Sequence, residues 1–174
     1  ATYTVTPTSG GCPGSTFTVT ATINPKPAVT AMTASACSGS GFTATPVNST
    51  NGVVPTGTTY SWAAPSVTGG LTGGTTGSGA SSITGTLTNP TNTAQTATYT
   101  VTPTAGSCTG STFTLTVTIN PTPAVTNMTA SSCSGSGFTA TPVNSTNGVV
   151  PTGTTYSWAA PSVTGGLTGG TTGS

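Results

Sequence analysis

Most of the sequence of this chain occurs twice. Residues 1–78 return as residues 97–174, so the sequence repeats with a period of 96 residues, and only eight of the 78 aligned positions differ. A fixed period of this length is typical of repeat architectures, in which similar units fold and stack on their neighbours. The sequence therefore predicts a tandem array of modules, with a role in reach, display or assembly rather than in a single catalytic pocket.

Two proline-rich segments mark where one repeat ends and the next begins. Asn-Pro-Lys-Pro at 24–27 returns as Asn-Pro-Thr-Pro at 120–123. Because proline fixes φ and lacks an N–H, such a segment is typical of a stiff connector between folded units. Cutting there predicts the last strands of a preceding module at 1–24, a complete module at 25–120 and a partial following module at 121–174. A slice through a longer array is the simplest interpretation.

Side chains that are charged at neutral pH are almost absent. The chain contains one lysine, Lys26, and no Arg, Asp, Glu or His. General acid–base catalysis requires a group that exchanges a proton near neutral pH, and Ser or Thr hydroxyls are poor nucleophiles without one. Calcium sites are built from carboxylates, zinc sites from closely spaced Cys and His, and nucleic-acid sites from basic patches. We therefore expect no enzyme activity, no metal or other cofactor and no nucleic-acid partner.

The abundance of small polar residues allows two interpretations. The chain has 48 Thr, 21 Ser, 25 Gly and 14 Pro, a composition that also occurs in disordered, mucin-like stalks. However, apolar residues recur among them at regular spacing, which favours a folded β domain. No apolar run approaches the ~18 residues of a membrane-spanning helix, so we expect no membrane insertion in this segment.

The clearest strands are two segments that alternate strictly. Residues 97–104 and 111–120 place an apolar residue at every second position, with threonine in between. A period of two with one apolar face describes a half-buried antiparallel strand, and β-branched Thr suits its solvent face. The six residues between them, 105–110, predict a hairpin loop.

Weaker patterns predict further strands at 29–34, 42–47, 58–63 and 81–88, and one more near 66–71. Clusters of Gly, Pro, Asn and Ser separate them. About seven short strands in one repeat fit an all-β fold of tandem immunoglobulin-like sandwiches. The predicted core consists of nine large apolar residues: Phe42, Trp62, Ile83, Leu87, Tyr99, Val101, Phe113, Leu115 and Ile119.

Several short motifs follow one another in a fixed order within the repeat. They are Cys37-Ser-Gly, Tyr60-Ser-Trp62, Leu87-Thr-Asn89, Tyr99-Thr-Val-Thr-Pro103, Cys108-Thr-Gly and Thr116-Val-Thr-Ile-Asn-Pro121. In this order they resemble the PKD-like repeats of Bacteroidota, which occur in very large cell-surface proteins, including gliding-motility adhesins carried out by the type IX secretion system. The resemblance covers the whole chain and implies an extracellular location on a bacterial cell. The Asp- and Gly-rich stretch that follows Tyr-x-Trp in better-known PKD domains is missing here, so the resemblance implies no calcium site.

The four cysteines, Cys12, Cys37, Cys108 and Cys133, fall two to a repeat. In a secreted module this number predicts one disulfide, formed in an oxidising compartment. The pairing that we prefer joins Cys37 to Cys108 within the complete module and leaves Cys12 and Cys133 to partners outside the chain. The alternative joins Cys12 to Cys37 and Cys108 to Cys133, which would staple successive modules together. Reduced, packed cysteines are the remaining interpretation.

Several features suit a binding surface but have simpler explanations. Tyr60 and Trp62 share one strand face, as in an aromatic platform, yet few other large side chains are available to fill a core. Rows of Thr suit a glycan-binding or ice-binding face, but they are also the expected solvent side of two strands. Asn48, Asn127 and Asn144 match the glycosylation pattern Asn-x-Ser/Thr, which arises by chance in a chain so rich in hydroxyl residues.

Two functions follow from these patterns. The first is a structural spacer or stalk repeat of a large extracellular adhesin or cell-surface filament, whose partners are the neighbouring repeats of the same chain. A surface without charges would also permit lateral self-association of such stalks through unpaired edge strands. The alternative is a repeat that itself binds a glycan or another surface through its Thr-rich faces and the loops 48–57 and 67–77.

Overall fold

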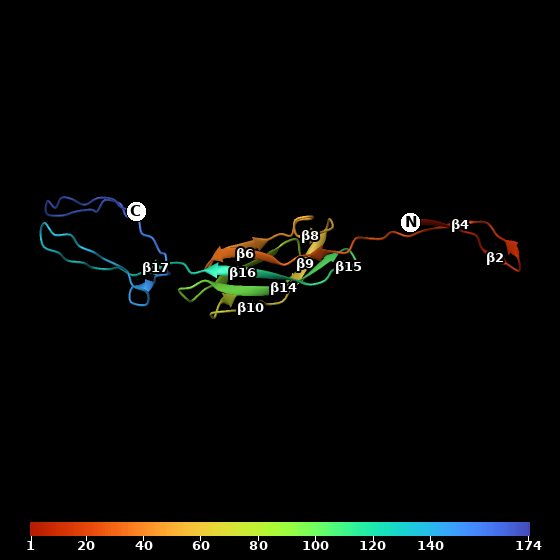
Figure 1. Ribbon diagram of the computed structural model, residues 1–174, viewed down its shortest axis with the longest axis horizontal. Helices are drawn as coiled ribbons and strands as arrows, with labels where there is room; N and C mark the ends of the chain where they lie inside the picture. Colours follow the sequence, from red (N-terminus) through yellow and green to blue (C-terminus); the bar gives the residue numbers. More distant parts are fainter.

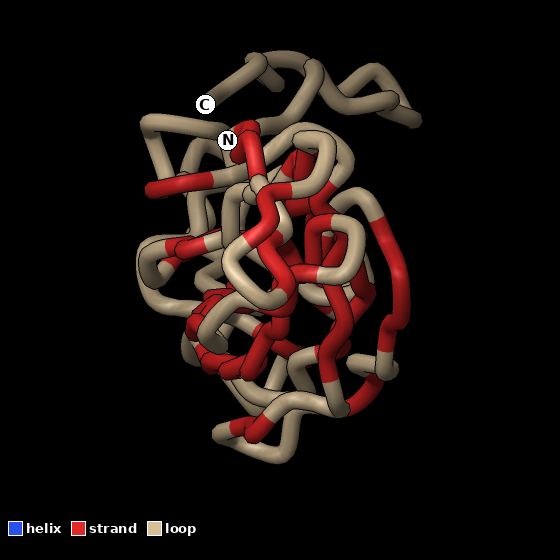
Figure 2. The backbone as a smooth tube through the Cα atoms, turned by 90° about the vertical axis from the view of Figure 1, so that its right-hand side faces the viewer, coloured by secondary structure: helices blue, strands red, loops and turns tan.

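The chain folds into one β-sandwich with an incomplete copy of the same unit on either side. A computed structural model describes residues 1–174, and it contains strands and loops but no helix (Figure 1; Figure 2). The sandwich, residues 28–120, lies in the middle of an elongated molecule, between a two-stranded ribbon and a largely irregular C-terminal segment (Figure 1). The all-β prediction is confirmed. No part of the structure forms a helix with the length and apolar character that crossing a membrane requires.

The larger sheet of the sandwich is built around its longest strand. Its main path follows the order β12 (Gly77–Ala80), β9 (Thr58–Trp62), β14 (Gln95–Ala105), β16 (Phe113–Asn120) and β6 (Met32–Cys37). Two short strands, β10 (Ser66–Val67) and β15 (Cys108–Thr109), also pair with β14. All these pairs are antiparallel except β16 with β6, which is parallel.

A smaller sheet forms the second layer. It has the order β11 (Thr72–Gly73), β13 (Ile83–Thr88) and β7 (Gly41–Ala44), and a separate short pair joins β5 (Ala28–Val29) to β8 (Gly52–Val53). The two layers meet through their apolar faces. Phe42 of the smaller sheet packs on Tyr99 of the larger one, with ring centroids 5.6 Å apart.

The alternating segments supply the centre of the core. Strands β14 and β16 pair so that Tyr99 lies opposite Leu115 and Val101 opposite Phe113. Because side chains alternate along a strand, this register puts all four on the inner face and the intervening threonines outside. Fifteen buried apolar residues form one core, which contains the nine predicted residues together with Val29, Ala44, Tyr60, Leu71, Ala97 and Val117.

The strand boundaries differ from the sequence-based ones where pairing or proline decides them. The predicted strand 42–47 ends at Ala44, two residues before Pro46, because proline cannot donate to a ladder. The predicted strand 29–34 is split between β5 and β6, since β6 is fixed by its parallel register with β16. The predicted loop 105–110 is tighter than expected because β15 pairs back onto β14.

The N-terminal ribbon shows which part of the fold is encoded locally. One side of the ribbon consists of β1 (Thr2–Val5) and β2 (Thr8–Ser9), which are both copies of parts of β14. The other side consists of β3 (Cys12–Pro13) and β4 (Phe17–Thr20), the copies of β15 and of part of β16. The two sides pair in the same register, with Tyr3 opposite Val19 and Val5 opposite Phe17. Yet Tyr3 is 58% exposed, whereas its copy Tyr99 is fully buried. The pairing of the hairpin is therefore present without the rest of a module, whereas its burial depends on one.

The C-terminal segment shows the opposite case. Residues 128–174 match residues 32–78 at every position except Ser132, which replaces Ala36, but the copies of β6, β7 and β9 are not strands there. Only β17 (Ala124–Val125) with β18 (Gly148–Val149), and a bridge between Trp158 and Gly173, retain the pairing of the sandwich. The missing strands have their partners in the copies of β13, β14 and β16, which this segment does not contain. Their formation is therefore decided by long-range pairing.

Trp62 is held on the inner face by a glycine of the edge strand. Its indole N–H donates to the carbonyl of Thr75 at 3.0 Å, and the backbone of Gly77 packs against the six-membered ring of the indole. A Cβ added at Gly77 would overlap that ring. The same contact recurs between Gly173 and Trp158, although Trp158 is otherwise exposed.

We predict that Gly77→Ala destabilises the sandwich by about 1–3 kcal/mol, because the added methyl group overpacks the indole. Urea unfolding followed by tryptophan fluorescence would measure the change. Gly41→Ala is the matched control, since a Cβ at this strand position meets the Thr86 hydroxyl at an ordinary 3.7 Å. Equal effects of the two substitutions would contradict the packing argument.

Two buried tyrosines predict how stability depends on pH. Burial raises the pKa of Tyr60 and of Tyr99 above the ordinary value of 10.0, because the charged phenolate is disfavoured inside the sandwich. The folded protein thus keeps these protons to higher pH than the unfolded chain. Stability from this source is fully present below pH 10 and is lost as the pH rises toward the folded pKa values. The free energy of unfolding falls by up to about 1.4 kcal/mol per pH unit for each tyrosine.

Thermal unfolding measured from pH 4 to 11 would check this prediction. Tyr99→Phe should weaken the alkaline loss, and it should not lower stability at neutral pH, because the Tyr99 hydroxyl is buried without a hydrogen-bond partner. Tyr3→Phe, at the exposed copy of the same position, is the control and should leave the profile unchanged. An alkaline loss that Tyr99→Phe does not alter would contradict the assignment.

Candidate functional site at the repeat junctions

The connectors meet the sandwich at its two ends. We call residues 24–27 the incoming connector and the adjoining end of the sandwich the proximal pole. Residues 120–123 are the outgoing connector, and the end they leave is the distal pole. In Figure 1 these poles face the N-terminal ribbon and the C-terminal segment, respectively.

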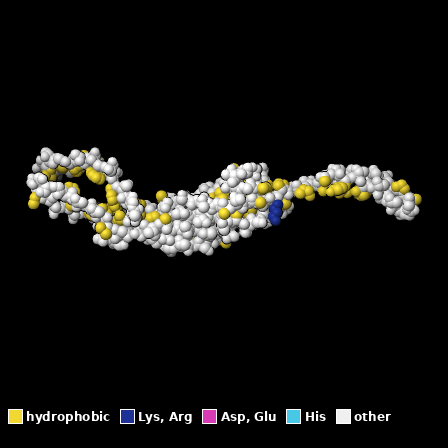
Figure 3. Space-filling model, viewed as in Figure 1, with side chains coloured by type: hydrophobic (Ala, Val, Ile, Leu, Met, Phe, Trp, Pro, Cys, Tyr) yellow, Lys and Arg dark blue, Asp and Glu magenta, His cyan; other side chains and the backbone are white.

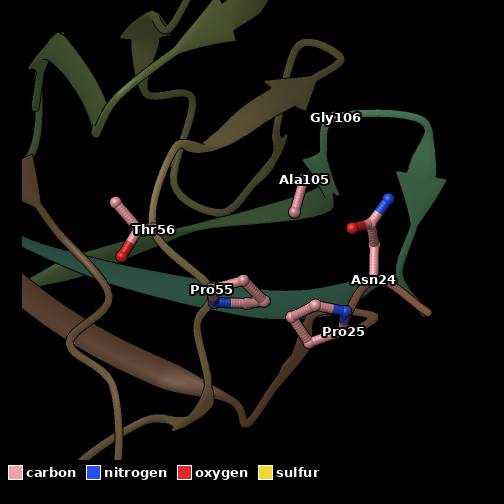
Figure 4. A pocket seen from close by; sticks show the side chains of 6 residues that line it. All are labelled: Asn24, Pro25, Pro55, Thr56, Ala105 and Gly106. Carbon is pink, nitrogen blue, oxygen red and sulfur yellow. The ribbon is translucent and has the colours of Figure 1, made fainter. Parts of the chain in front are cut away.

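The incoming connector is held against the proximal pole. Pro27 is fully buried, and Gly110 approaches its carbonyl so closely that a Cβ at residue 110 would overlap it. Beside the connector lies an open hollow of about 440 Å³, lined by Asn24, Pro25, Pro55, Thr56, Ala105 and Gly106. In Figure 4 the rings of Pro25 and Pro55 point toward each other across it.

A second hollow, of about 380 Å³, lies at the distal pole. It is lined by Asn92, Thr93, Ala94, Asn120, Pro121, Pro151 and Thr152. Pro151 and Thr152 are the copies of Pro55 and Thr56 in the following repeat. The same Pro-Thr turn therefore borders both hollows, and at the distal pole it faces the 92–94 loop of the module before it. Both hollows belong to the junctions between repeats.

A buried asparagine organises the distal pole. Asn89 donates from Nδ2 to the carbonyl oxygens of Thr93 at 2.8 Å and Ile119 at 2.9 Å. Its Oδ1 accepts from the backbone N–H of Thr91 at 2.9 Å and from the Thr91 hydroxyl at 2.8 Å. Its own backbone N–H donates to the Ser38 hydroxyl at 2.8 Å. Asn89 thereby ties the ends of β13 and β16 to the loop after β6.

The outgoing connector is fixed to that same loop. The Ser38 amide donates to the carbonyl of Asn120 at 2.8 Å, and the Thr122 hydroxyl donates to the carbonyl of Ser38 at 3.2 Å. Sequence reasoning gave no role to Ser38 or Asn89. The dipeptide Asn89-Pro90, directly after a predicted strand, was the signal for a structured turn.

Both predicted disulfide pairings are wrong, because the structure places the cysteines of each predicted bond far apart. Cys37 lies opposite Asn120 at the distal pole, whereas Cys108 pairs with Ala105 beyond the other end of β16. At ~3.3 Å per residue, β16 alone separates them by more than 20 Å, and a disulfide needs Cα atoms within about 7 Å. Cys12 belongs to the N-terminal ribbon on the proximal side, and Cys133 to the C-terminal segment on the distal side, so Cys12–Cys37 and Cys108–Cys133 would each have to span the sandwich (Figure 1). No two of the four cysteines are paired with each other.

The other candidate residues have structural places. Tyr60 and Trp62 are buried, so they form no exposed aromatic platform. Asn48 braces its loop by accepting from the Val54 N–H at 2.9 Å, and Asn144 makes the same bond to Val150. Asn127 lies exposed in the C-terminal segment.

The exposed groups limit the chemistry of the junctions. Lys26, on the incoming connector, is exposed and is the single charged side chain; the rest of the visible surface carries neither acidic nor basic groups (Figure 3). Neither hollow is lined by an ionisable side chain. The linings offer prolines, amides and hydroxyls, which are suited to packing and hydrogen bonding between repeats. The fold and its junctions thus define a β-sandwich module with a connector at each pole.

Comparison with protein families identifies the module. A PKD-like domain model matches residues 1–27 and 34–123, which together make up more than half of the chain. The chain therefore belongs to the PKD-like domain family. Such domains are generally structural, non-catalytic modules and are typically extracellular. Searches of curated proteins and of solved structures gave no significant match.

We predict that Asn89→Ala destabilises the sandwich by about 2–3 kcal/mol, because it leaves the buried Ile119 carbonyl without its donor. Asn92→Ala is the matched control, since no side-chain hydrogen bond of Asn92 supports the pole. Chemical unfolding would give both values, and hydrogen exchange should show lost protection at the end of β16. A cost for Asn89→Ala no larger than that for Asn92→Ala would argue against this role.

Proposed function

We propose that the chain is part of a structural spacer or stalk in a large extracellular protein, an adhesin or cell-surface filament that holds a functional tip away from a bacterial cell. Each repeat would be one sandwich, bounded by the connectors at 24–27 and 120–123. The resemblance to PKD-like repeats of gliding-motility adhesins in Bacteroidota agrees with this role. The proposal assigns no catalytic activity to the repeat.

One observation carries the proposal: the connectors meet the sandwich at opposite poles. A module that receives the chain at one end and releases it at the other adds its full length to an array. The Pro-Thr turn of the following repeat lines the same hollow as the 92–94 loop of the distal pole, which supports direct contact between successive modules. Contacts of this kind between neighbours are sufficient to hold a linear array together.

The length of an array tests this role. The eleven residues of β14 span about 36 Å, so each repeat should add roughly 40 Å. Electron microscopy of arrays with four and eight copies of residues 25–120 should show thin beaded threads that differ in length by about 160 Å. Particles that instead grow equally in all directions would refute the proposal.

The same preparations address lateral self-association and the binding alternative. The strands β12 and β6 are edges of the larger sheet and carry no charge that would repel another edge. Threads lying side by side, and dispersed by lysines introduced on β6 at Thr33 and Ser35, would support association through this edge. Binding of the arrays to a glycan panel would favour the alternative function, a repeat that recognises a surface itself.

A further inference from the structure

The two cysteines of the complete module each lie beside a connector. At the proximal pole, Cys108 Sγ is 4.0 Å from the carbonyl oxygen of Asn24. At the distal pole, Cys37 is the register partner of Asn120, and the amide of the next residue, Ser38, donates to the carbonyl oxygen of Asn120 at 2.8 Å. Each cysteine is therefore close to the carbonyl of a connector asparagine.

These two asparagines occupy the same position of the repeat, 96 residues apart. In an array, every connector asparagine thus follows the Cys37 position of one module and precedes the Cys108 position of the next. Both contacts are made to the same oxygen, which has two lone pairs and can accept both. In an array, the Sγ atom at the Cys108 position of one repeat therefore lies near the backbone nitrogen at the Ser38 position of the repeat before it. The distance between these two atoms cannot exceed the sum of their distances to the shared oxygen. This limit does not depend on the angle between the modules.

We propose that a disulfide closes each junction between the Cys37 position of one repeat and the Cys108 position of the following repeat. This inference rests on the tandem array assumed in the proposed function. Within this distance limit, rotation of the two cysteine side chains and of the connector can bring the two sulfur atoms to disulfide geometry. All four cysteines of residues 1–174 then pair with cysteines of repeats outside this segment, and no two of the four are partners.

The surroundings of both cysteines permit the reaction. Cys37 is exposed and Cys108 is half-buried, so an oxidant can reach either thiol. The oxidant is the disulfide of a thiol–disulfide oxidoreductase. One thiolate attacks that disulfide to give a mixed disulfide, and the second thiolate displaces the oxidoreductase sulfur. The junction gains one S–S bond, the oxidoreductase is reduced to a dithiol, and the two protons of the junction thiols pass to it.

The test uses the full chain followed by a second copy of residues 79–120, which completes the following module. The junction variant keeps Cys37 and the appended copy of Cys108, with serine at Cys12, Cys108 and Cys133. The matched control keeps Cys37 and Cys108 of the same module, with serine at the other three positions. After incubation in a glutathione redox buffer, alkylation and intact-mass measurement count the free thiols, and circular dichroism checks that each variant is folded.

We expect the junction variant to lose both thiols as a monomer, and the control to keep both. Two free thiols in a folded junction variant, closure of the control, or disulfide-linked dimers would each overturn the proposal. Peptide mapping of the native protein, which identifies the cysteines that are joined, is a second test of the proposal. Neighbouring copies are distinguishable because Cys12 stands between Gly and Pro, and Cys108 between Ser and Thr. Electron microscopy of reduced arrays tests the spacer role separately, because the thread does not require the disulfide.

Discussion

The fold depends on the apolar face that β14 and β16 present together. In a chain with one charged side chain, ion pairs contribute nothing, so burial of apolar surface must provide most of the stability. The pairing of Tyr99 with Leu115 and of Val101 with Phe113 gathers large side chains on one side of the hairpin. Every other element of the sandwich either extends this sheet or covers that face. The same alternation leaves threonine outside, which explains the composition.

The two incomplete copies separate local from long-range determinants of the fold. The N-terminal hairpin keeps the register of its copy in the sandwich, and the loop braced by Asn48 recurs unchanged around Asn144. Such features could be predicted from the sequence, because alternation and turn residues encode them locally. The strand at 41–44 has no counterpart at 137–140, although the residues are identical. No window of sequence could have revealed that difference, since the partner strand decides it.

The junctions were harder to predict than the core, for a related reason. The periodic prolines located the connectors, but the position of each cysteine along the sandwich depends on the parallel register of β6 with β16. That register places Cys37 beside the outgoing connector, and sequence spacing alone suggested a bond within the module. The role of Asn89 was likewise hidden, because its partners at Thr91, Thr93 and Ile119 converge only once the sandwich has formed.

The parallel pair of β6 and β16 also determines how an array would respond to tension. In an array whose junction cysteines are reduced, the incoming chain soon enters β6 and the chain leaves from the end of β16, so a pull along the array draws these neighbours in opposite directions. Their six register pairs, from Met32 with Leu115 to Cys37 with Asn120, are then loaded in shear. The hydrogen bonds between them must fail together rather than one after another. A module held in this way would resist stretching far better than a hairpin peeled open from one end.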